Sequence, residues 1–315
     1  MKVLVTGADG FVGSWLVPKL QESGHEVTAA VRPAGSGGDE VHRQLSNEVP
    51  TISLELLDPE SVKQALNHEW DAVVHLAAMA SGSDVNRDPM AGWKVNTVGT
   101  ALLVHELGER AVGGLDPVIL IASTAEVYGA GSATPRIESD PAQPTSPYAA
   151  TKLAAECAAM EVHRRTGLRV IVSRAFPHTG PGQDERFVVP AFTRRLRDAK
   201  LRGAPAVKVG NLTPVREFTH VADVADAYVQ LLQKGQAGEV YNVSSGRGIT
   251  IRELFFMLTD ALEMEAIPEV DPRLVRRADV PYLVGDSRKL RETTGWEPSK
   301  SLEQTIFEVA RAQAD

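Results

Sequence analysis

The sequence predicts an α/β fold in which helices cover both faces of a doubly wound parallel sheet, followed by a smaller C-terminal α/β lobe. Two observations predict it. In the first half, short apolar or β-branched runs alternate with longer helical patterns, which is typical of a parallel sheet. Several of these runs, such as Val118 to Ile121, are apolar at consecutive positions, as expected of strands that are buried on both faces.

The expected elements follow in order along the chain. We predict a first strand over residues 2–6 and a first helix over 11–23. Further strands are predicted over 26–31, 51–55, 72–76, 117–122 and 169–174. Because helical patterns separate these strands, they can lie parallel in one sheet.

The alternation weakens after about Ala175, where prolines mark loops around a helix predicted over 187–199. Strand and helix patterns return near 217–245, and a further helix is predicted over 251–262. We therefore expect a Rossmann-type domain formed by residues 1–175 plus about 217–245. Residues from about 176–216 plus 246–315 would form a substrate-binding lobe, with the ligand between the two.

Composition excludes several classes of function. The chain has 315 residues, which exceeds the ~250–300 at which a single core tends to divide. Its 33 basic and 41 acidic residues give a net charge of -8, which disfavours nucleic acid as a partner. With no apolar run near ~18 residues and Cys157 as the single cysteine, we expect a cytoplasmic protein with no membrane partner and no disulfide. The histidines lack ligand spacing, so we expect no metal.

A glycine-rich turn spans residues 6–13, between the first strand and the first helix. Gly7 permits a tight turn, Gly10 allows close approach of a pyrophosphate, and Gly13 lets the helix pack on the strand. The diphosphate would lie at the helix N-terminus. Strand-to-helix turns also contain glycine for structural reasons alone, but this turn opens a βαβ pattern, which favours a dinucleotide cofactor.

The residue after the second strand indicates which dinucleotide binds. An acidic residue there accepts hydrogen bonds from the ribose of NAD, whereas this chain has Arg32, which attracts the 2′-phosphate of NADP. NADP(H) is therefore favoured and NAD(H) remains the alternative, because Arg32 could also be a solvated loop residue. Asp58 could accept a hydrogen bond from adenine, or it could be the N-cap of a helix that begins at Pro59.

Tyr148 and Lys152 are the predicted catalytic pair. They are four residues apart at the start of a helical pattern, so their side chains share one face. We expect the ammonium group to lower the pKa of the phenol from ~10, which would let Tyr148 exchange a proton with a carbonyl oxygen. Thr124 lies at the C-terminal end of a predicted strand, where α/β sheets bind ligands, and would share the developing charge.

Glu126 and Asn96 complete the predicted catalytic set. Glu126 follows Thr124 by two residues and is either an acid/base group or a solvated loop acid. Asn96 has no propensity reason to lie inside a helix. We therefore expect Asn96 to hold a water molecule or a backbone carbonyl beside Lys152.

Several motifs of the chain resemble those of the extended short-chain dehydrogenase/reductases, or NAD-dependent epimerase/dehydratases. In chain order they are the glycine-rich turn, residues 75–78, Asn96, Thr124, and the pair formed by Tyr148 and Lys152. Within that family, the C-terminal half is most similar to the GDP-4-dehydro-6-deoxy-D-mannose reductases. The segments that carry this resemblance are 174–183, 187–188, 207–212, 215–219, 241–243 and 294–296, together with Arg276. The likeness covers nearly the whole chain.

The resemblance implies an oxidoreductase of nucleotide-sugar metabolism that uses NADPH to reduce the C4 ketone of GDP-4-dehydro-6-deoxy-D-mannose, giving GDP-D-rhamnose. Tyr148 would donate the proton, with Lys152 as its electrostatic partner. The alanine-rich helix after Lys152 resembles the interface of a homodimer. The implied cofactor residues are Gly7, Gly10, Phe11, Val12, Gly13, Arg32, Leu57, Asp58, Leu76, Ala77, Ala78, Tyr148, Lys152, Ala175 and His178. The implied substrate residues are Ser81, Thr124, Phe187, Val188, Lys208, Asn211, Arg216 and Arg276.

Other activities stay open. The family segment usually has the order Phe-Asn-His, but this chain has Pro177 between Phe176 and His178, so an amide that would contact the substrate is missing. Glu126 is placed as in the GDP-mannose 4,6-dehydratases, which need a base for water elimination. A dehydratase and a C4 epimerase are therefore alternatives, although the preference for NADP(H) favours the reductase. A non-catalytic dinucleotide-sensing protein is a remote alternative, because the tyrosine and the lysine are both present.

Overall fold

A parallel sheet forms the centre of the computed structural model, which describes residues 1–33, 45–46, 48–131, 133–275 and 280–312. Within these residues the sheet has seven strands in the order β11-β6-β5-β4-β1-β2-β3, and every neighbouring pair is parallel. The α/β prediction is therefore confirmed. The strands are β1 (Lys2–Thr6), β2 (Glu26–Val31), β3 (Thr51–Ser53), β4 (Ala72–His75), β5 (Val118–Thr124), β6 (Arg169–Ala175) and β11 (Val240–Val243).

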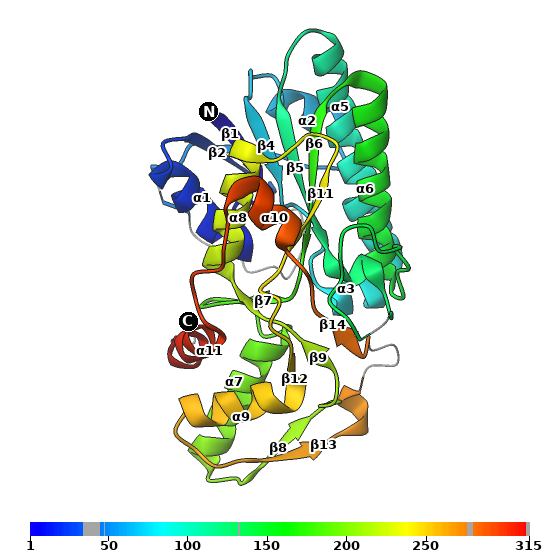
Figure 1. The fold of residues 1–315 in the computed structure, drawn as a ribbon. Helices are drawn as coiled ribbons and strands as arrows, with labels where there is room; N and C mark the ends of the chain where they lie inside the picture. Colours follow the sequence, from blue (N-terminus) through cyan, green and yellow to red (C-terminus); the bar gives the residue numbers. More distant parts are fainter. Residues whose placement is uncertain (34–44, 47, 132, 276–279, 313–315) are drawn as a thin grey trace.

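Helices cover both faces of this sheet (Figure 1). The first face carries α1 (Phe11–Glu22), α8 (Val221–Lys234) and α10 (Arg288–Thr294), and the second carries α2 (Pro59–Ala65), α5 (Thr100–Val112) and α6 (Pro147–Thr166). Val3 and Val5 of β1 pack into the core on the first face, while Leu4 packs into the core on the second. Consecutive apolar residues therefore mark a strand that is buried on both sides.

A second group of elements lies at the carboxyl end of the strands (Figure 1). It has its own apolar core, in which the rings of Phe192 and Phe255 meet edge to face with centroids 5.7 Å apart. Its helices are α7 (Val188–Arg202), α9 (Ile251–Ala261) and α11 (Leu302–Arg311). Its strands are β7 (His178–Thr179), β8 (Ala206–Val209), β9 (Val215–Arg216), β10 (Thr219–His220), β12 (Ile249–Thr250), β13 (Ile267–Val270) and β14 (Tyr282–Leu283).

One element belongs to the sheet rather than to this second group. Leu290 of α10 and the nearby Trp296 lie in the core that covers the first face of the sheet, and the Trp296 indole donates a hydrogen bond of 3.0 Å to the Asp223 carbonyl of α8. Residues 288–296 nevertheless fall inside the range predicted for the substrate-binding lobe. The boundaries of the two lobes remain a prediction.

Candidate active site

The glycine-rich turn leaves no space for side chains at two of its positions. A Cβ on Gly7, whose φ is +66°, would lie 2.8 Å from the Ala77 nitrogen, and a Cβ on Gly13 would lie 2.4 Å from the Ala8 carbonyl oxygen. Gly10 is the N-cap of α1 and supplies no side-chain cap. The N-terminus of α1 therefore lies at this turn, where the helix dipole favours the negative charge of a dinucleotide diphosphate.

A buried chain of hydrogen bonds ties this turn to α5. The Thr6 hydroxyl accepts from the Ala77 amide at 3.2 Å and lies 2.8 Å from His75 Nδ1. On the other side of the ring, His75 Nε2 lies 3.0 Å from the Thr100 hydroxyl. Because that hydroxyl donates its own proton to the Asn96 carbonyl at 2.6 Å, it must accept from Nε2, which fixes the neutral tautomer. Burial and the charge of Lys152 lower the pKa of His75 to about 3.

Tyr148 and Thr124 meet where α6 begins and β5 ends. The Ser146 hydroxyl caps α6 by accepting from the Ala149 amide at 3.1 Å, and Pro147 occupies the first turn. This start places the Tyr148 phenol next to the Thr124 hydroxyl, which acts on the pKa of the phenol.

The protonation of Tyr148 differs from our expectation. Burial, and next the charge of Glu126, raise the pKa of the phenol, while the nearby Thr124 hydroxyl opposes them. The prediction that Lys152 lowers this pKa is therefore wrong for the structure described, because loss of water around the phenol outweighs any attraction from the ammonium group. The Tyr148 phenol therefore keeps its proton at neutral pH.

Lys152 is buried one helical turn after Tyr148, with 6% of its surface exposed. Burial lowers the pKa of its ammonium group to about 8, and the negative charge of Glu156 opposes that shift. The group therefore remains mostly charged at neutral pH and titrates in the mildly alkaline range.

Asn96 holds backbone beside the predicted pair, as expected, but in a different kind of helix. Its amide accepts from the Met79 nitrogen at 2.8 Å and donates to the Met79 carbonyl at 3.3 Å and to the Thr151 hydroxyl at 3.1 Å. The Thr151 hydroxyl in turn donates to the Tyr148 carbonyl at 2.8 Å. Asn96 lies in a π-helix, η1 (Trp93–Gly99), a form that is frequent at functional sites.

An ion pair that is not among the predicted site residues lies next to Lys152 along α6. Glu156 and Arg174 are both buried, and the Arg174 Nη2 atom lies 2.8 Å from the carboxylate. The signal that could have found Glu156 is its position four residues after Lys152, which places both side chains on one face of α6. No sequence pattern pairs it with Arg174, which lies on β6.

Other predicted cofactor and substrate residues gather near the same strand ends. The rings of Phe11 and His178 are stacked with centroids 6.3 Å apart, and Ala175 is the register partner of Thr124. Leu76, Ala77 and Ala78 follow β4 directly. Ser81 is the N-cap of α3 (Gly82–Arg87), and a Cβ on Gly82 would lie 4.0 Å from the Tyr148 side chain.

The predicted adenosine residues lie at the other end of the cofactor region. Arg32 comes directly after β2, and Leu57 is 38% exposed before α2. Asp58 is the N-cap of α2 and accepts from the Glu60 amide at 3.0 Å, so the capping alternative is confirmed. The contact of Asp58 with adenine stays a prediction.

The predicted substrate residues of the second group are spread along it. Phe187 and Val188 are at the start of α7, and Arg216 lies on β9. Lys208 lies on β8, at the far end of the group from the sheet (Figure 1), and the Asn211 side chain accepts from the Thr213 amide at 3.1 Å. Arg276 lies outside the described residues.

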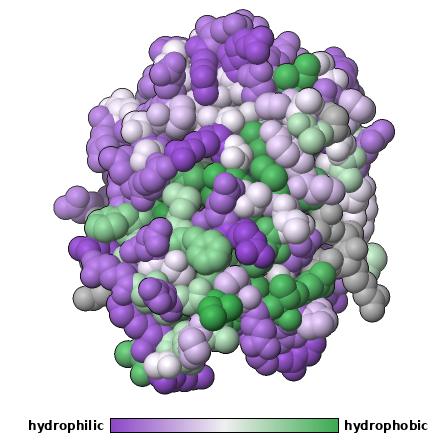
Figure 2. Space-filling view, turned by 60° about the horizontal axis from the view of Figure 1, so that its bottom comes forward, coloured by the Kyte–Doolittle hydropathy of each residue, from purple (hydrophilic) through white to green (hydrophobic). Residues whose placement is uncertain are grey.

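Apolar side chains are exposed beside Lys208. Lys208 pairs with Glu269 of β13, and a Cβ on Gly210 would lie 3.6 Å from the Leu274 side chain. Figure 2 brings this end of the molecule forward and shows hydrophobic residues among hydrophilic ones. The exposed apolar residues of this end include Ile267, Val270, Leu274 and Val275.

Two further observations concern metal binding and membrane crossing. Among the described residues, no cluster of three His, Cys, Asp or Glu side chains could hold a metal ion. In the same part of the chain, every helix is too short or too polar to cross a bilayer.

The parallel sheet with this strand order, the glycine-rich turn and the ordered motifs define an extended short-chain dehydrogenase/reductase. Residues 4–309 match the model of the family described as GDP-mannose 4,6 dehydratase. The chain belongs to that family.

Similar proteins with described activities include both reductases and epimerases. The GDP-6-deoxy-D-mannose reductase of Pseudomonas aeruginosa is 35% identical over 309 residues, covering 97% of this chain and 94% of the relative. The structure of RMD from Pseudomonas aeruginosa complexed with NADPH has a TM-score of 0.81 and 32% identity, covering 98% of this chain and 97% of that one. The Thermus thermophilus UDP-glucose 4-epimerase complex with NAD has a TM-score of 0.84 and 31% identity, covering 98% of each chain.

Proposed function

We propose that this protein is an NADPH-dependent reductase of the 4-keto group of a nucleoside-diphosphate 4-keto-6-deoxyhexose. GDP-4-dehydro-6-deoxy-D-mannose is the proposed substrate and GDP-D-rhamnose the product. The observation that supports this proposal most is that the Tyr148 phenol lies next to the Thr124 hydroxyl, one helical turn before the buried Lys152. The similarity to the GDP-6-deoxy-D-mannose reductase supports the choice of sugar.

The residues of the glycine-rich turn fit a nicotinamide dinucleotide. Side chains at Gly7 and Gly13 would collide with backbone atoms, and α1 has no side-chain cap, so the backbone can approach a diphosphate closely. Such a cofactor, when bound, supplies the hydride that reduces a carbonyl carbon. Arg32 after β2 supports NADP(H), as does a similar protein complexed with NADPH. NAD(H) is the alternative, because a similar epimerase is complexed with NAD.

The chain's own residues would supply the proton and stabilise the charge that forms on the sugar oxygen. Tyr148 is protonated at neutral pH because burial raises its pKa, so it can donate its proton to the C4 oxygen as that oxygen becomes negative. The phenolate left behind is stabilised by the Lys152 ammonium group, one helical turn away. The Thr124 hydroxyl would donate or accept a hydrogen bond at the C4 oxygen of the sugar and keep that oxygen aligned.

Recognition of the rest of the substrate is assigned to the second group. Arg216 would bind the diphosphate through charge-assisted hydrogen bonds, together with Arg276. Phe187, Val188 and Ser81 would surround the sugar. Lys208 and Asn211 would lie toward the nucleobase, which the exposed apolar side chains of β13 and of the following segment, Val270 and Leu274, support.

One observation favours a second candidate function. The charge of Glu126 acts on the Tyr148 phenol, so a carboxylate lies close to the proposed reacting oxygen. In a 4,6-dehydratase, such a group would assist water elimination after oxidation at C4. The family to which the chain belongs is described by that activity. A C4 epimerase is a further alternative, supported by the similar UDP-glucose 4-epimerase.

We also assign a homodimer and a cytoplasmic location to the protein. The outer surface of α6 and of the helices beside it includes exposed Cys157, Trp93 and Val98, and α5 packs along α6. A second copy could cover these side chains in a four-helix arrangement. Sedimentation of the pure protein at a monomer mass would contradict the dimer.

The test of the proposed activity is a direct assay. Pure protein is mixed with NADPH and GDP-4-dehydro-6-deoxy-D-mannose, loss of reduced-nicotinamide absorbance is followed, and the product is identified by NMR. Formation of GDP-D-rhamnose is the expected result. No oxidation above background would contradict the reductase, and turnover of GDP-mannose or UDP-glucose in parallel samples would identify the dehydratase or the epimerase.

A further inference from the structure

The ion pair between Glu156 and Arg174, next to Lys152 along α6, is buried and held by several hydrogen bonds. Arg174 Nε lies 3.2 Å from each oxygen of the Glu156 carboxylate, and Nη2 lies 2.8 Å from Oε2. The Ser123 hydroxyl also donates to this carboxylate. With 4% of Glu156 and 7% of Arg174 exposed, this is a geometry in which a buried pair can offset its own desolvation.

This cluster joins β6 to α6 and β5, the two elements that bear Tyr148, Lys152 and Thr124. Glu156 lies on α6, one turn after Lys152. Ser123 precedes Thr124 on β5, and its register partner on β6 is Arg174. A shift of the ion pair would therefore move α6 relative to the ends of both strands.

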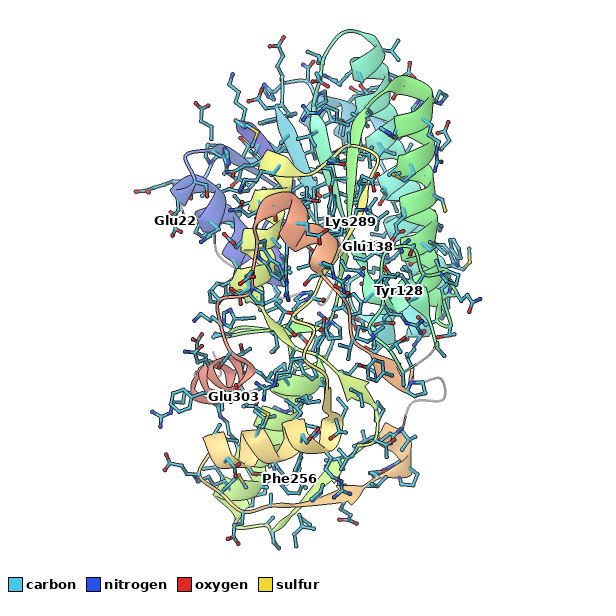
Figure 3. All side chains as sticks on the ribbon, in the orientation of Figure 1. Glu22, Tyr128, Glu138, Phe256, Lys289 and Glu303 are labelled. Carbon is cyan, nitrogen blue, oxygen red and sulfur yellow. The ribbon has the colours of Figure 1, made fainter. Side chains whose placement is uncertain are left out.

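The arginine side of the pair is itself held in place. The Arg174 guanidinium lies 4.8 Å from the centre of the Tyr128 ring, a residue that is labelled in Figure 3. The Tyr128 hydroxyl donates to the Asn242 side chain of β11 at 2.7 Å. These contacts orient the ion pair, because a guanidinium stacked on an aromatic face has little freedom to rotate.

Glu156 is the member of the pair that lies one helical turn from Lys152, on the same face of α6. Glu156 is the group whose charge favours the charged lysine, and burial is the opposing effect. The other ionisable groups around the lysine do not supply a negative charge at neutral pH: His75 of β4 is neutral, Tyr148 of α6 keeps its proton, and Arg174 of β6 is a cation. Glu126 contributes its charge on the far side, at Tyr148.

We propose that Glu156, oriented by Arg174 and Ser123, is a positioning residue that keeps the buried Lys152 ammonium group charged and fixed beside Tyr148. This inference rests on the proposed function, because the charge matters to catalysis only if Tyr148 donates a proton. Without the carboxylate, desolvation would be unopposed and Lys152 would lose its proton at lower pH. The alkaline pH limit of the activity would then also move to lower pH.

The experiment measures the titration of Lys152 directly. Protein labelled with ¹³C at the lysine Cε is titrated by NMR, and the Lys152 signal is assigned by its loss in Lys152→Arg. We expect a midpoint near pH 8 in the parent protein and a midpoint lower by about one to two pH units in Glu156→Gln. The alkaline limb of the pH profile of NADPH oxidation should move by a similar amount.

Two further variants keep the test informative if Glu156→Gln alone is unstable. Removing one partner of a buried pair leaves an unpaired charge, so Glu156→Gln combined with Arg174→Met removes both charges. In this double variant, the midpoint of the Lys152 titration should also be lower than in the parent. Glu156→Asp keeps the charge and should restore the midpoint to within about half a unit of the parent.

A matched control uses the second glutamate–arginine pair on the neighbouring helix. Glu106 of α5 accepts from Arg110 at 3.2 Å, and Glu106→Gln should leave the Lys152 midpoint unchanged. An unchanged midpoint in the folded Glu156 variants, with activity reduced equally at every pH, would overturn the proposal and leave Glu156 a structural residue. The NMR titration needs no substrate, so absence of NADPH oxidation in the parent would count against the proposed function alone.

Discussion

The Tyr148 phenol, in the first turn of α6, lies next to the hydroxyl of Thr124, the last residue of β5. Two elements that are far apart in sequence thus bring a proton donor and a hydroxyl to one point. Their pairing is the structural basis of the proposed reduction, and it makes the roles of the two residues separable by mutation.

Removing the Thr124 hydroxyl should slow the reaction without unfolding the protein. We expect Thr124→Val to lower kcat about 10²-fold, because one donor to the developing oxyanion is lost. Thr124→Ser keeps the hydroxyl and should retain most of the activity. A Thr124→Val enzyme as fast as the parent in steady-state assays would exclude Thr124 from the reaction.

Gly7 and Gly24 form a matched pair for testing the cofactor turn. Both have positive φ, of +66° and +79°, but a Cβ on Gly24 meets no atom within 4 Å, whereas a Cβ on Gly7 collides with the Ala77 backbone. Gly24→Ala should lower the free energy of unfolding by about 1–2 kcal/mol through backbone strain alone. Gly7→Ala should lower it further and weaken NADPH binding by about 10-fold or more.

Fluorescence titration with NADPH and thermal unfolding measure both effects. Equal NADPH affinity in the two glycine variants would show that the turn does not bind the cofactor.

Arg32 should determine the choice of dinucleotide. If it binds the 2′-phosphate of NADP, Arg32→Ala should lower kcat/KM for NADPH by about 10- to 100-fold, which corresponds to a lost charge-assisted hydrogen bond. The value for NADH should change little. Parallel assays with the two cofactors give the ratio of kcat/KM for NADPH to kcat/KM for NADH. A variant ratio equal to that of the parent would show Arg32 to be a solvated loop residue.

Glu217 should make the stability of the protein depend on pH. Burial raises the pKa of its carboxyl to about 8, although the Gly246 amide donates to it at 2.7 Å. The folded state therefore keeps a proton that the unfolded chain releases near pH 4.5. By linkage, the free energy of unfolding falls as pH rises between about 4.5 and 8, by a few kcal/mol in total, and this contribution is constant outside that window.

The variant Glu217→Gln isolates this effect. It keeps an oxygen to accept from Gly246 but cannot ionise, so its stability relative to the parent should increase as pH rises from 5 to 8. Urea unfolding at a series of pH values measures the difference. A difference between the two proteins that is independent of pH would show that Glu217 is not the group responsible.

Sequence patterns were sufficient to predict the sheet and most of the residues of the candidate site. The first strand is predicted at its observed bounds, because both faces of β1 are buried and its residues are apolar in succession. Tyr148 and Thr124 are brought together as expected, because Thr124 ends β5 and Tyr148 lies in the first turn of α6. Asn96 lies inside η1 and reaches α6 through its hydrogen bond to Thr151. The order of the motifs along the chain is therefore enough to predict that these residues lie close together.

The remaining features depend on contacts that no local pattern records. Strands such as β7 and β9 have two residues each, too few to show the alternation by which strands are recognised. The pKa of Tyr148 is set by burial, which the spacing to Lys152 does not report. Glu156 and Arg174 are paired through the register of β5 and β6 rather than through sequence proximity.

The most direct test of the proposed chemistry is a single-turnover measurement of NADPH oxidation with GDP-4-dehydro-6-deoxy-D-mannose, comparing the parent protein with Tyr148→Phe. Phenylalanine keeps the ring and removes only the donated proton. We expect the variant to bind NADPH with unchanged affinity and to oxidise it about 10²- to 10⁴-fold more slowly. Oxidation by Tyr148→Phe at the parent rate would contradict the central claim that this phenol protonates the sugar oxygen.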